Sequence, residues 1–465
     1  NARPHLGHAI LHLYADAFAR YHRQMGDDVQ YSAGTDEHGG KIAEVAAKQG
    51  KETQAFADEI SASFADGLKK LGISNDRFIR TTDKDHEARV AKIWKQLEKD
   101  IYKNAYIGMY CTGSEEFKSN AHVKETEGTC PLHNRAYDKV EEENYFFALS
   151  KYNDRIKEAV KSDTYRIRPM SRRNEILGVL REGLEDISVS RKATSVAWGI
   201  PVPGDDTQTI YVWFEALMNY ITTLGYPEHD DFKKYWPADM QVIGKDILRF
   251  HAAIWPAMLM GLELPLPETL YVHGFVTSDG QKMSKTLGNV VDPLEVVERY
   301  GLDAFRYYFF RHGPANDDVD FTWDKFEAAY NNELANELGN AVSRVSAMIN
   351  RYQDRAIGDM SANNHDDGEY HDAIAECRFD RALEAVWDQV RGLNQYIEET
   401  KPWSVAKEGD EEHLQSILAE AAGSLLEIAE LLVPFMPDTA QKIQWVFGEG
   451  LIKKLDQASL FPKAE

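Results

Sequence analysis

The sequence predicts an α/β protein in which a parallel-sheet domain is split by an insertion and followed by a C-terminal helical-bundle domain. Short apolar strands alternate with amphipathic helices over the first hundred residues, and this alternation returns between about residues 188 and 285. Between them lies a stretch that carries two of the three cysteines. From residue 331 onward, apolar residues recur at helical spacing. A chain of 465 residues is also too long for a single core.

The first helix is expected to follow a turn that is rich in histidine and glycine. His5 and His8 flank Gly7, and apolar residues from Ile10 to Tyr21 follow at helical spacing. A helix start offers unpaired N–H groups and the positive end of a dipole to an anion. Glycine lets a flat ring or a phosphate approach the backbone, and imidazoles donate hydrogen bonds to phosphate oxygens. The stretch favours an anion site, although two histidines near a helix start are often incidental.

A strand is expected over residues 29–33, and the loop from Gly34 to Gly40 ends it. A second short strand is expected at 78–80, with helices between the two strands and after the second. Ligands of parallel sheets bind at the carboxyl ends of strands, where this loop falls. Asp36 can bind an ammonium group there. The alternative is that Asp, Gly and His simply form a good turn.

Residues 280–289 read GQKMSKTLGN and follow a strand expected over residues 271–276. Lys282, Lys285 and two hydroxyl side chains lie between glycines in this stretch. Such a composition is typical of a mobile lid that binds a polyphosphate.

The HLGH and KMSKT stretches, in this order, resemble the two signatures of class I aminoacyl-tRNA synthetases. The sequences around them narrow the resemblance to the methionyl-tRNA synthetases, and it covers essentially the whole chain. It implies a Rossmann-like parallel-sheet catalytic domain, split by an insertion, and a helical anticodon-binding domain. The implied boundaries are 1–103 and 188–285 for the two catalytic halves, 104–187 for the connective insertion, 286–330 for the lid end and stem-contact segment, and 331–465 for the bundle.

The resemblance also implies which residues bind the small substrates. The residues implied for ATP are His5, Gly7, His8, Gly274, Lys282 and Lys285, of which the histidines and lysines would stabilise charge on the phosphates. The residues implied for methionine are Asp36, Trp213, Tyr220, Ile247 and His251. An aromatic wall suits a flexible, polarizable thioether. Without the resemblance, the last four would be interpreted as core residues. One further wall of the pocket is expected on a strand upstream of Asn1.

The insertion resembles the zinc knuckle of many members of this family, in which C-x-x-C is followed by C-x-x-C or C-x-x-H. This chain has Cys111, Ser114, Cys130 and His133 at those places. Structural zinc sites normally have four nitrogen or sulfur ligands, and serine is a poor substitute. We therefore expect a degenerate knuckle without a metal. A zinc ion on Cys111, Cys130 and His133 is the less favoured alternative.

In the bundle, Asn340 and Arg344 lie one helical turn apart, so both can reach the same base. Trp403 follows Pro402 and can stack an unpaired base. The resemblance implies that these three side chains read the anticodon. The alternative for Trp403 is ordinary packing.

The formal net charge is −23, and residues 331–465 carry 25 acidic against 12 basic side chains. This excludes a protein that coats nucleic acid by general electrostatics, so RNA must be bound through local contacts. No run of about 18 apolar residues is present, so we expect no membrane partner. Three cysteines give no disulfide framework, which favours the cytoplasm. We expect no appended domain after the bundle and therefore a monomer.

The implied reaction activates methionine with ATP, with Mg²⁺ bridging phosphate oxygens, and then charges methionine tRNA. Catalysis would consist of positioning and charge stabilisation. One alternative is a class I synthetase for another amino acid, which the short insertion, Trp213 and His251 argue against. The other is a catalytically inactive homologue that binds RNA or nucleotides, which the intact lysines and histidines argue against.

Overall fold

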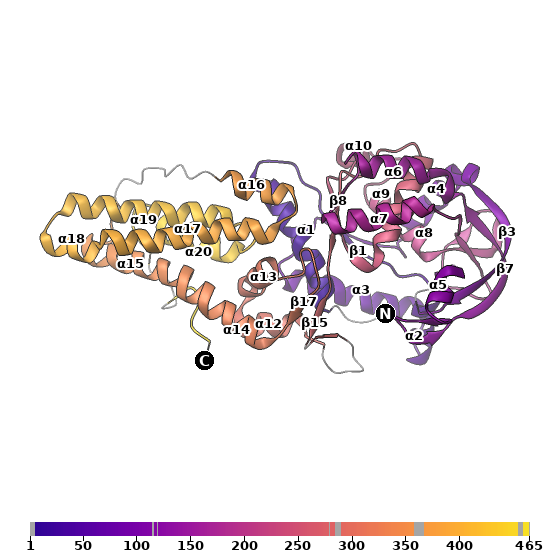
Figure 1. Ribbon diagram of the computed structural model, residues 1–465, viewed down its shortest axis with the longest axis horizontal. Helices are drawn as coiled ribbons and strands as arrows, with labels where there is room; N and C mark the ends of the chain where they lie inside the picture. The colour runs from indigo at the N-terminus through magenta and orange to yellow at the C-terminus, as the bar shows by residue number, and fades with distance from the viewer. Residues whose placement is uncertain are drawn as a thin grey trace. The chain divides into compact units, whose positions relative to one another are not determined.

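The computed structural model describes residues 5–113, 116–118, 120–278, 280–283, 290–357, 367–453 and 459–464, and it confirms the predicted α/β fold class. Contacts divide the chain into two compact units (Figure 1). Unit 1 consists of Asn1–Pro4, Gln30–Lys69 and Asn75–Val272. Unit 2 consists of His5–Val29, Lys70–Ser74 and His273–Glu465. This grouping is coarser than the five segments expected from the sequence, whose boundaries stay predictions.

Unit 1 begins with a parallel strand pair joined by helices. Strand β1 (Ser32–Thr35) pairs in parallel with β2 (Arg77–Arg80), as the alternating pattern predicts. The connecting helices are α2 (Gly40–Lys48) and α3 (Thr53–Lys70), and α4 (Lys84–Leu97) follows β2. The first strand starts later than expected because the turn at Asp76 binds both the backbone N–H and the carbonyl of Tyr31.

A second sheet of unit 1 has the order β13-β14-β8. Strand β14 (Thr269–His273) pairs in parallel with β8 (Arg166–Arg168), which lies within the segment 104–187. The third strand is β13 (Met240–Gly244). The main apolar core of the unit surrounds fully buried aromatic side chains, among them Trp94, Phe214 and Trp255.

The connective segment is built on a long antiparallel hairpin of β3 (Ile101–Cys111) and β7 (Asp138–Phe147) (Figure 1). Strands β4 (Glu116–Lys118) and β9 (Ile187–Ser188) flank the hairpin. The elements between β4 and β7 are α5 (Asn120–Glu125), β5 (Thr129–Cys130) and β6 (Arg135–Ala136).

The remaining elements of unit 1 are short. They are η1 (Glu98–Asp100), η2 (Leu149–Tyr152), α6 (Asn153–Lys161), α7 (Met170–Glu182), β10 (Ser190–Lys192), β11 (Pro201–Val202), β12 (Asp205–Ile210), α8 (Val212–Ala216), α9 (Asn219–Thr222), α10 (Asp230–Tyr235), η3 (Lys245–Ile247), η4 (Phe250–Ile254) and α11 (Trp255–Gly261).

Unit 2 combines the first helix of the chain with its C-terminal half. Helix α1 (Leu6–Gln24) contacts α13 (Leu302–Arg311). A small sheet has the order β16-β15-β17. Its strands and the helices near it are β15 (Val276–Ser278), β16 (Gln281–Lys282), β17 (Val319–Phe321), α12 (Pro293–Tyr300) and α14 (Trp323–Ala329).

The helical bundle expected from residue 331 onward is confirmed, and it begins with the π-helix η5 (Tyr330–Gly339). Its helices are α15 (Asn340–Tyr352), α16 (Gly368–Ala375), α17 (Phe379–Thr400), α18 (Pro402–Glu408), α19 (Glu411–Leu432) and α20 (Pro437–Phe447). The long helices α17 and α19 run side by side (Figure 1). Both are amphipathic, and their apolar stripes are buried.

The strand expected over residues 271–276 is split in two, because β14 ends at His273 and β15 begins at Val276. At the break, the backbone N–H of Gly274 donates to the carbonyl of Pro314 at 2.8 Å. A Cβ at this position would lie 2.5 Å from the carbonyl oxygen of Asp317, so only glycine permits this close approach.

Within the part of the chain that the structure describes, no helix has both the length and the apolar character needed to cross a bilayer.

Candidate active site

The loop after β1 is held by hydrogen bonds on nearly every residue. Glu37 receives two hydrogen bonds from the guanidinium of Arg80, at 2.8 and 2.7 Å. Its carbonyl accepts from Trp198 Nε1 at 2.6 Å, and the N–H of Gly39 donates to the carbonyl of Trp198 at 3.0 Å. The loop is therefore a fixed platform rather than a loose turn.

Asp36 is the exception in this loop. Its side chain is exposed, and it makes no hydrogen bond or ion pair with the described residues, whereas Thr35, Glu37 and His38 are all bonded. Although part of the residue is open to solvent, the protein atoms packed around its carboxyl group displace hydrating water. This desolvation, and then the charge of Glu215, raises the pKa of Asp36 to about 6. A carboxylate held in place without a partner is suited to bind a cation such as an ammonium group.

Tyr220, Ile247 and His251, which the family resemblance implies in one pocket, lie together in unit 1. The Tyr220 hydroxyl lies 2.9 Å from His251 Nε2, and His251 Nδ1 lies 3.1 Å from the carbonyl oxygen of Ile247. Burial lowers the pKa of His251 to about 4, so the ring is neutral at pH 7. Because Nδ1 faces a carbonyl, the ring proton is on Nδ1, and Nε2 accepts a hydrogen bond from the Tyr220 hydroxyl.

Trp213 stacks on Phe250, with ring centroids 4.2 Å apart and planes 19° from parallel. Sequence reasoning did not select Phe250, although its position next to His251 was a usable signal. The structure thus brings four predicted residues and Phe250 into one region of unit 1, which we call the amino-acid cluster (Trp213, Tyr220, Ile247, Phe250, His251). The charge of Asp36 helps raise the pKa of Tyr220, which places Asp36 within electrostatic range of this cluster.

His5 and His8 form a reciprocal cap at the start of α1. His5 Nδ1 accepts from the N–H of Gly7 at 3.1 Å, and His8 Nδ1 accepts from the N–H of His5 at 3.3 Å. The rings lie 3.8 Å apart, and a Cβ on Gly7 would lie 3.1 Å from the His5 ring. Burial, and then the nearby His5, lowers the pKa of His8 to about 3. Neutral His8 therefore carries its proton on Nε2, where it is a hydrogen-bond donor.

Sequence reasoning missed two further histidines near this cap. His12 follows His8 by one helical turn, and burial lowers its pKa to about 4. His273, which is buried at the end of β14, lowers the pKa of both His8 and His12. The i, i+4 spacing of His8 and His12 was a usable signal.

The predicted lid lies largely outside the described residues. Strands β15 and β16 pair around a turn at Gly280, which has a positive φ of 71°. Lys282 ends β16, but its side chain is outside the described part of the structure, and so is all of Lys285. Their roles stay predictions.

The three residues predicted to read an anticodon lie together in unit 2. Asn340 and Arg344 are on α15, and the guanidinium of Arg344 lies 5.8 Å from the ring centroid of Trp403 on α18. Arg344 also donates to Glu398 at 2.6 Å. A cavity of about 390 Å³ is lined by Asn336, Glu337, Asn340, Arg344, Arg391, Asn394, Gln395 and Glu398. Trp403 is half-buried, so one part of its ring is open to solvent.

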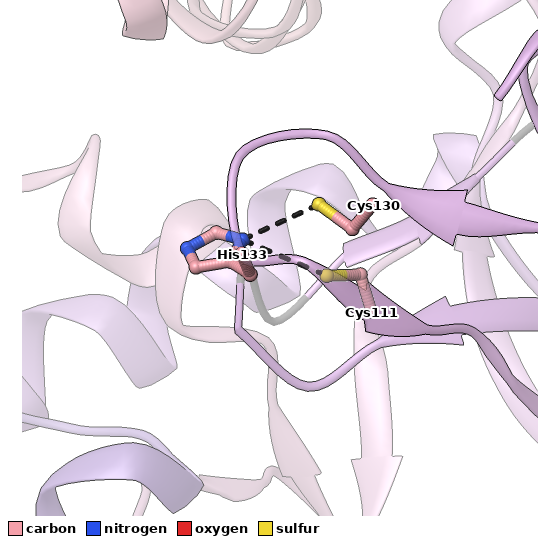
Figure 2. Close-up of side chains that lie close together, drawn as sticks. All are labelled: Cys111, Cys130 and His133. Carbon is pink, nitrogen blue, oxygen red and sulfur yellow. Dashed lines mark hydrogen bonds between the residues drawn. The ribbon is translucent and has the colours of Figure 1, made fainter. Parts of the chain in front are cut away.

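Cys111, Cys130 and His133 converge between the ends of the connective hairpin (Figure 2). Their ligand atoms lie within 4.8 Å of one another, and His133 Nδ1 is 3.3 Å from Cys130 Sγ and 3.8 Å from Cys111 Sγ. Tetrahedral zinc would place these atoms about 3.5 Å apart. A Cβ on Gly113 would lie 2.5 Å from the His133 ring, so this glycine admits the imidazole. The three donors fit zinc; Ser114 is outside the described residues.

The chain is similar in sequence to known proteins. A family model described as "tRNA synthetases class I (M)" matches residues 1–141 and 132–346. The methionine–tRNA ligase of Thermotoga maritima is 41% identical over 459 residues, which cover 95% of this chain and 73% of the relative. The methionine–tRNA ligase of Streptomyces coelicolor is 41% identical, over 95% of this chain and 87% of the relative. The chain belongs to the methionyl-tRNA synthetase family.

A solved member of the methionyl-tRNA synthetase family, from Mycobacterium tuberculosis and in complex with methionyl-adenylate, has a TM-score of 0.92. It is 34% identical, and the match covers 99% of this chain and 97% of the other. The resemblance seen in the sequence is thereby confirmed as membership of the methionyl-tRNA synthetases. The roles of individual residues stay predictions.

Proposed function

We propose that this chain activates methionine with ATP to methionyl-adenylate and transfers the methionyl group to the 3′ end of methionine tRNA. The observation that carries the proposal is Asp36, a carboxylate without a hydrogen bond or ion pair to the described residues, in a loop whose other acidic and polar side chains are bonded and within electrostatic range of an aromatic cluster. Methionine combines an ammonium group, which a carboxylate binds, with a thioether, which favours aromatic contacts. The related M. tuberculosis enzyme was solved with methionyl-adenylate.

In the first step, a carboxylate oxygen of methionine attacks the α-phosphorus of ATP, and the bond to pyrophosphate breaks. The protein forms no covalent bond and acts through positioning and charge stabilisation. Asp36 holds the ammonium group, and the amino-acid cluster holds the side chain. Neutral His8 donates a hydrogen bond to a phosphate oxygen from Nε2, and His5 assists.

Positive charge for the phosphates comes from the lid lysines, Lys282 and Lys285, because His8 is neutral at pH 7. Gly7 and Gly274 leave room for the nucleotide. Mg²⁺ enters with ATP as the MgATP substrate, bound by phosphate oxygens. Among the described residues, the only group suited to hold a metal ion is the cysteine–histidine cluster of the connective hairpin. Zinc held by Cys111, Cys130 and His133 would be structural, cross-linking the hairpin.

In the second step, a ribose hydroxyl at the 3′ end of tRNA takes the methionyl group and releases AMP. Asn340, Arg344 and Trp403 identify the tRNA through its anticodon. With its acidic surface, the chain binds tRNA by such local contacts rather than by general charge. We expect it to act as a monomer in the cytoplasm.

The test is amino-acid-dependent exchange of pyrophosphate into ATP, measured with the full-length protein and each of the twenty amino acids. Exchange is expected with methionine only. Robust exchange with leucine or isoleucine, and none with methionine, would mean a synthetase of another specificity. Binding of ATP and tRNA without any exchange would identify an inactive homologue instead.

A further inference from the structure

A fully buried carboxylate is hydrogen-bonded to the loop that carries Asp36. Glu215, on α8, has no exposed surface. Its Oε1 accepts from His38 Nδ1 at 3.0 Å, and its Oε2 accepts from His86 Nε2 at 3.0 Å. His38 belongs to the loop, whereas His86 is on α4, and both are buried. Each carboxylate oxygen therefore holds a different segment of unit 1.

The hydrogen-bond chain continues to a fourth segment, because His86 Nδ1 lies 2.7 Å from Thr222 Oγ1 on α9. Three members of the chain lie two positions from a residue proposed to bind methionine. These pairs are His38 with Asp36, Glu215 with Trp213, and Thr222 with Tyr220. A single buried network thus joins the loop, α8 and α9, which supply the ammonium site and two walls of the pocket.

Burying a charged carboxylate is unfavourable unless hydrogen bonds from the protein replace its hydration. Burial alone would raise the pKa of Glu215, but hydrogen bonds from His38 and His86 outweigh this effect and hold it below its ordinary value. Glu215 is therefore charged at pH 7. After burial, its charge is the main reason that the pKa of Asp36 is raised.

Other charged groups surround this network. Glu37 acts on Asp36 in the same direction as Glu215, and His86 and His38 act in the opposite direction. Arg80 pairs with Glu37 at 2.7 Å, and Glu87 lies 3.8 Å from His38 Nε2. Glu215 is the only one of these carboxylates in direct contact with both imidazoles.

We propose that Glu215 is a positioning residue for methionine, which fixes the Asp36 loop against α8 and α9 by bridging His38 and His86. This proposal rests on the proposed methionine activation and names a residue that does not touch the substrate.

The first test is Glu215→Gln, assayed by methionine-dependent pyrophosphate exchange. An amide cannot accept from both imidazoles, so the KM for methionine is expected to rise roughly 10- to 100-fold, the effect of losing a hydrogen bond to a charged group. The KM for ATP is expected to stay within about threefold, since the nucleotide contacts are unchanged. The acid limb of kcat/KM for methionine is expected to move to lower pH, because a neighbouring negative charge is gone.

Glu215→Asp separates geometry from charge. Aspartate keeps the charge but is too short to reach both imidazoles, so the KM for methionine rises while the acid limb stays in place. A second pair of variants works from the loop side. His38→Ala removes the donor and is expected to raise the KM, whereas His38→Asn, whose amide can replace Nδ1–H, is expected to restore most of the affinity. If the Glu215 variants do not fold, the two His38 variants still test whether the bridge to Glu215 positions the loop for methionine.

Asp100→Asn is the matched control, because Asp100 is a buried carboxylate of unit 1 whose side-chain partners, Lys151 at 2.5 Å and Tyr152 at 2.7 Å, are not members of the network. This variant is expected to lower the melting temperature without changing the KM for methionine or the acid limb of kcat/KM. The proposal is overturned if Glu215→Gln leaves the KM for methionine and the acid limb of kcat/KM unchanged. It is also overturned if His38→Asn and His38→Ala have the same KM for methionine. If the wild-type protein shows no methionine-dependent exchange, the proposed function fails instead.

Discussion

Burial lowers the pKa of His8 to about 3 and that of His251 to about 4, so both imidazoles are neutral at physiological pH. A neutral ring offers one directed donor and one directed acceptor, and the bond to one nitrogen fixes the role of the other. His251 uses both nitrogens within the pocket and thereby orients the Tyr220 hydroxyl. At the residue scale, these histidines therefore provide directed hydrogen bonds. Positive charge for the phosphates must come from other residues.

Asp36 gives the first residue-scale prediction. Its pKa of about 6 is higher than the ordinary value, so its carboxylate is lost as the pH falls through about 6. We expect kcat/KM for methionine to fall about tenfold per pH unit below this value, since only the ionised form binds the ammonium group. Asp36→Asn should raise the KM for methionine and remove this acid limb, as measured by pyrophosphate exchange between pH 5 and 8. An asparagine variant with the wild-type pH profile would show that another group titrates.

At the element scale, the short helix α18 places Trp403 against Arg344 of α15. The ring is only half-buried, unlike Trp387 of the neighbouring α17, which has no exposed surface. The exposed part of the indole remains available for a base, and the cavity beside Asn340 and Arg344 can receive the edge of that base.

We therefore expect Trp403→Ala to cut charging of methionine tRNA by roughly 10- to 100-fold, the effect of losing one base stack. Methionine-dependent pyrophosphate exchange should stay near wild type, and so should the melting temperature. Truncating a core tryptophan would instead destabilise the fold by roughly 3–5 kcal/mol. Trp387→Ala is the matched control for that outcome. Normal charging by the Trp403 variant would return this residue to a packing role.

The connective hairpin is a second element whose chemistry can be measured. Three donors converge there, but structural zinc sites are normally closed by a fourth nitrogen or sulfur ligand. We expect purified protein to carry less than one zinc per chain, as determined by elemental analysis. One tightly held zinc per chain would contradict this expectation, and zinc should then be lost in Gly113→Ala, because a Cβ there would displace the His133 ring.

On the scale of the whole molecule, the first helix belongs to unit 2, with the C-terminal half of the chain. Arg306 of α13 has no exposed surface and pairs with the fully buried Asp16 of α1 at 2.8 Å. It also donates to the carbonyl oxygens of Phe435, at 2.6 Å, and Pro434, at 2.9 Å. One guanidinium thus ties the helix that starts with His5 to the turn between α19 and α20.

Breaking this buried pair from one side should be destabilising. Arg306→Met removes one of the cations that pair with the Asp16 carboxylate, while Arg20, at 2.7 Å, and Ser74 still bind it. We expect a loss of about 1.5–3 kcal/mol in the free energy of unfolding, the effect of losing a hydrogen bond to a charged group. The double variant with Asp16→Asn should be less destabilised than the sum of the two single variants, as measured by denaturant unfolding. Additive losses would show that the two side chains are not coupled.

The sequence by itself determined the fold class, the alternation of strands and helices in unit 1, the helical bundle and the family. Local periodicity encodes these features, because each side chain's direction follows from its position within a helix or strand. Through the family resemblance, it also selected Asp36 and the other residues that are predicted to bind methionine.

Only the tertiary structure decided which side chains are paired, buried and charged. His38 and Glu215 are 177 positions apart, and no local pattern links them. The same holds for Arg306 and Asp16, and for the neutral state of His251. A pKa depends on the solvent and charges around a group, which the folded chain alone assembles. The sequence therefore points to Asp36, whereas the fold shows that Asp36 makes no hydrogen bond or ion pair with the described residues and that Glu215 is hydrogen-bonded to His38 of its loop.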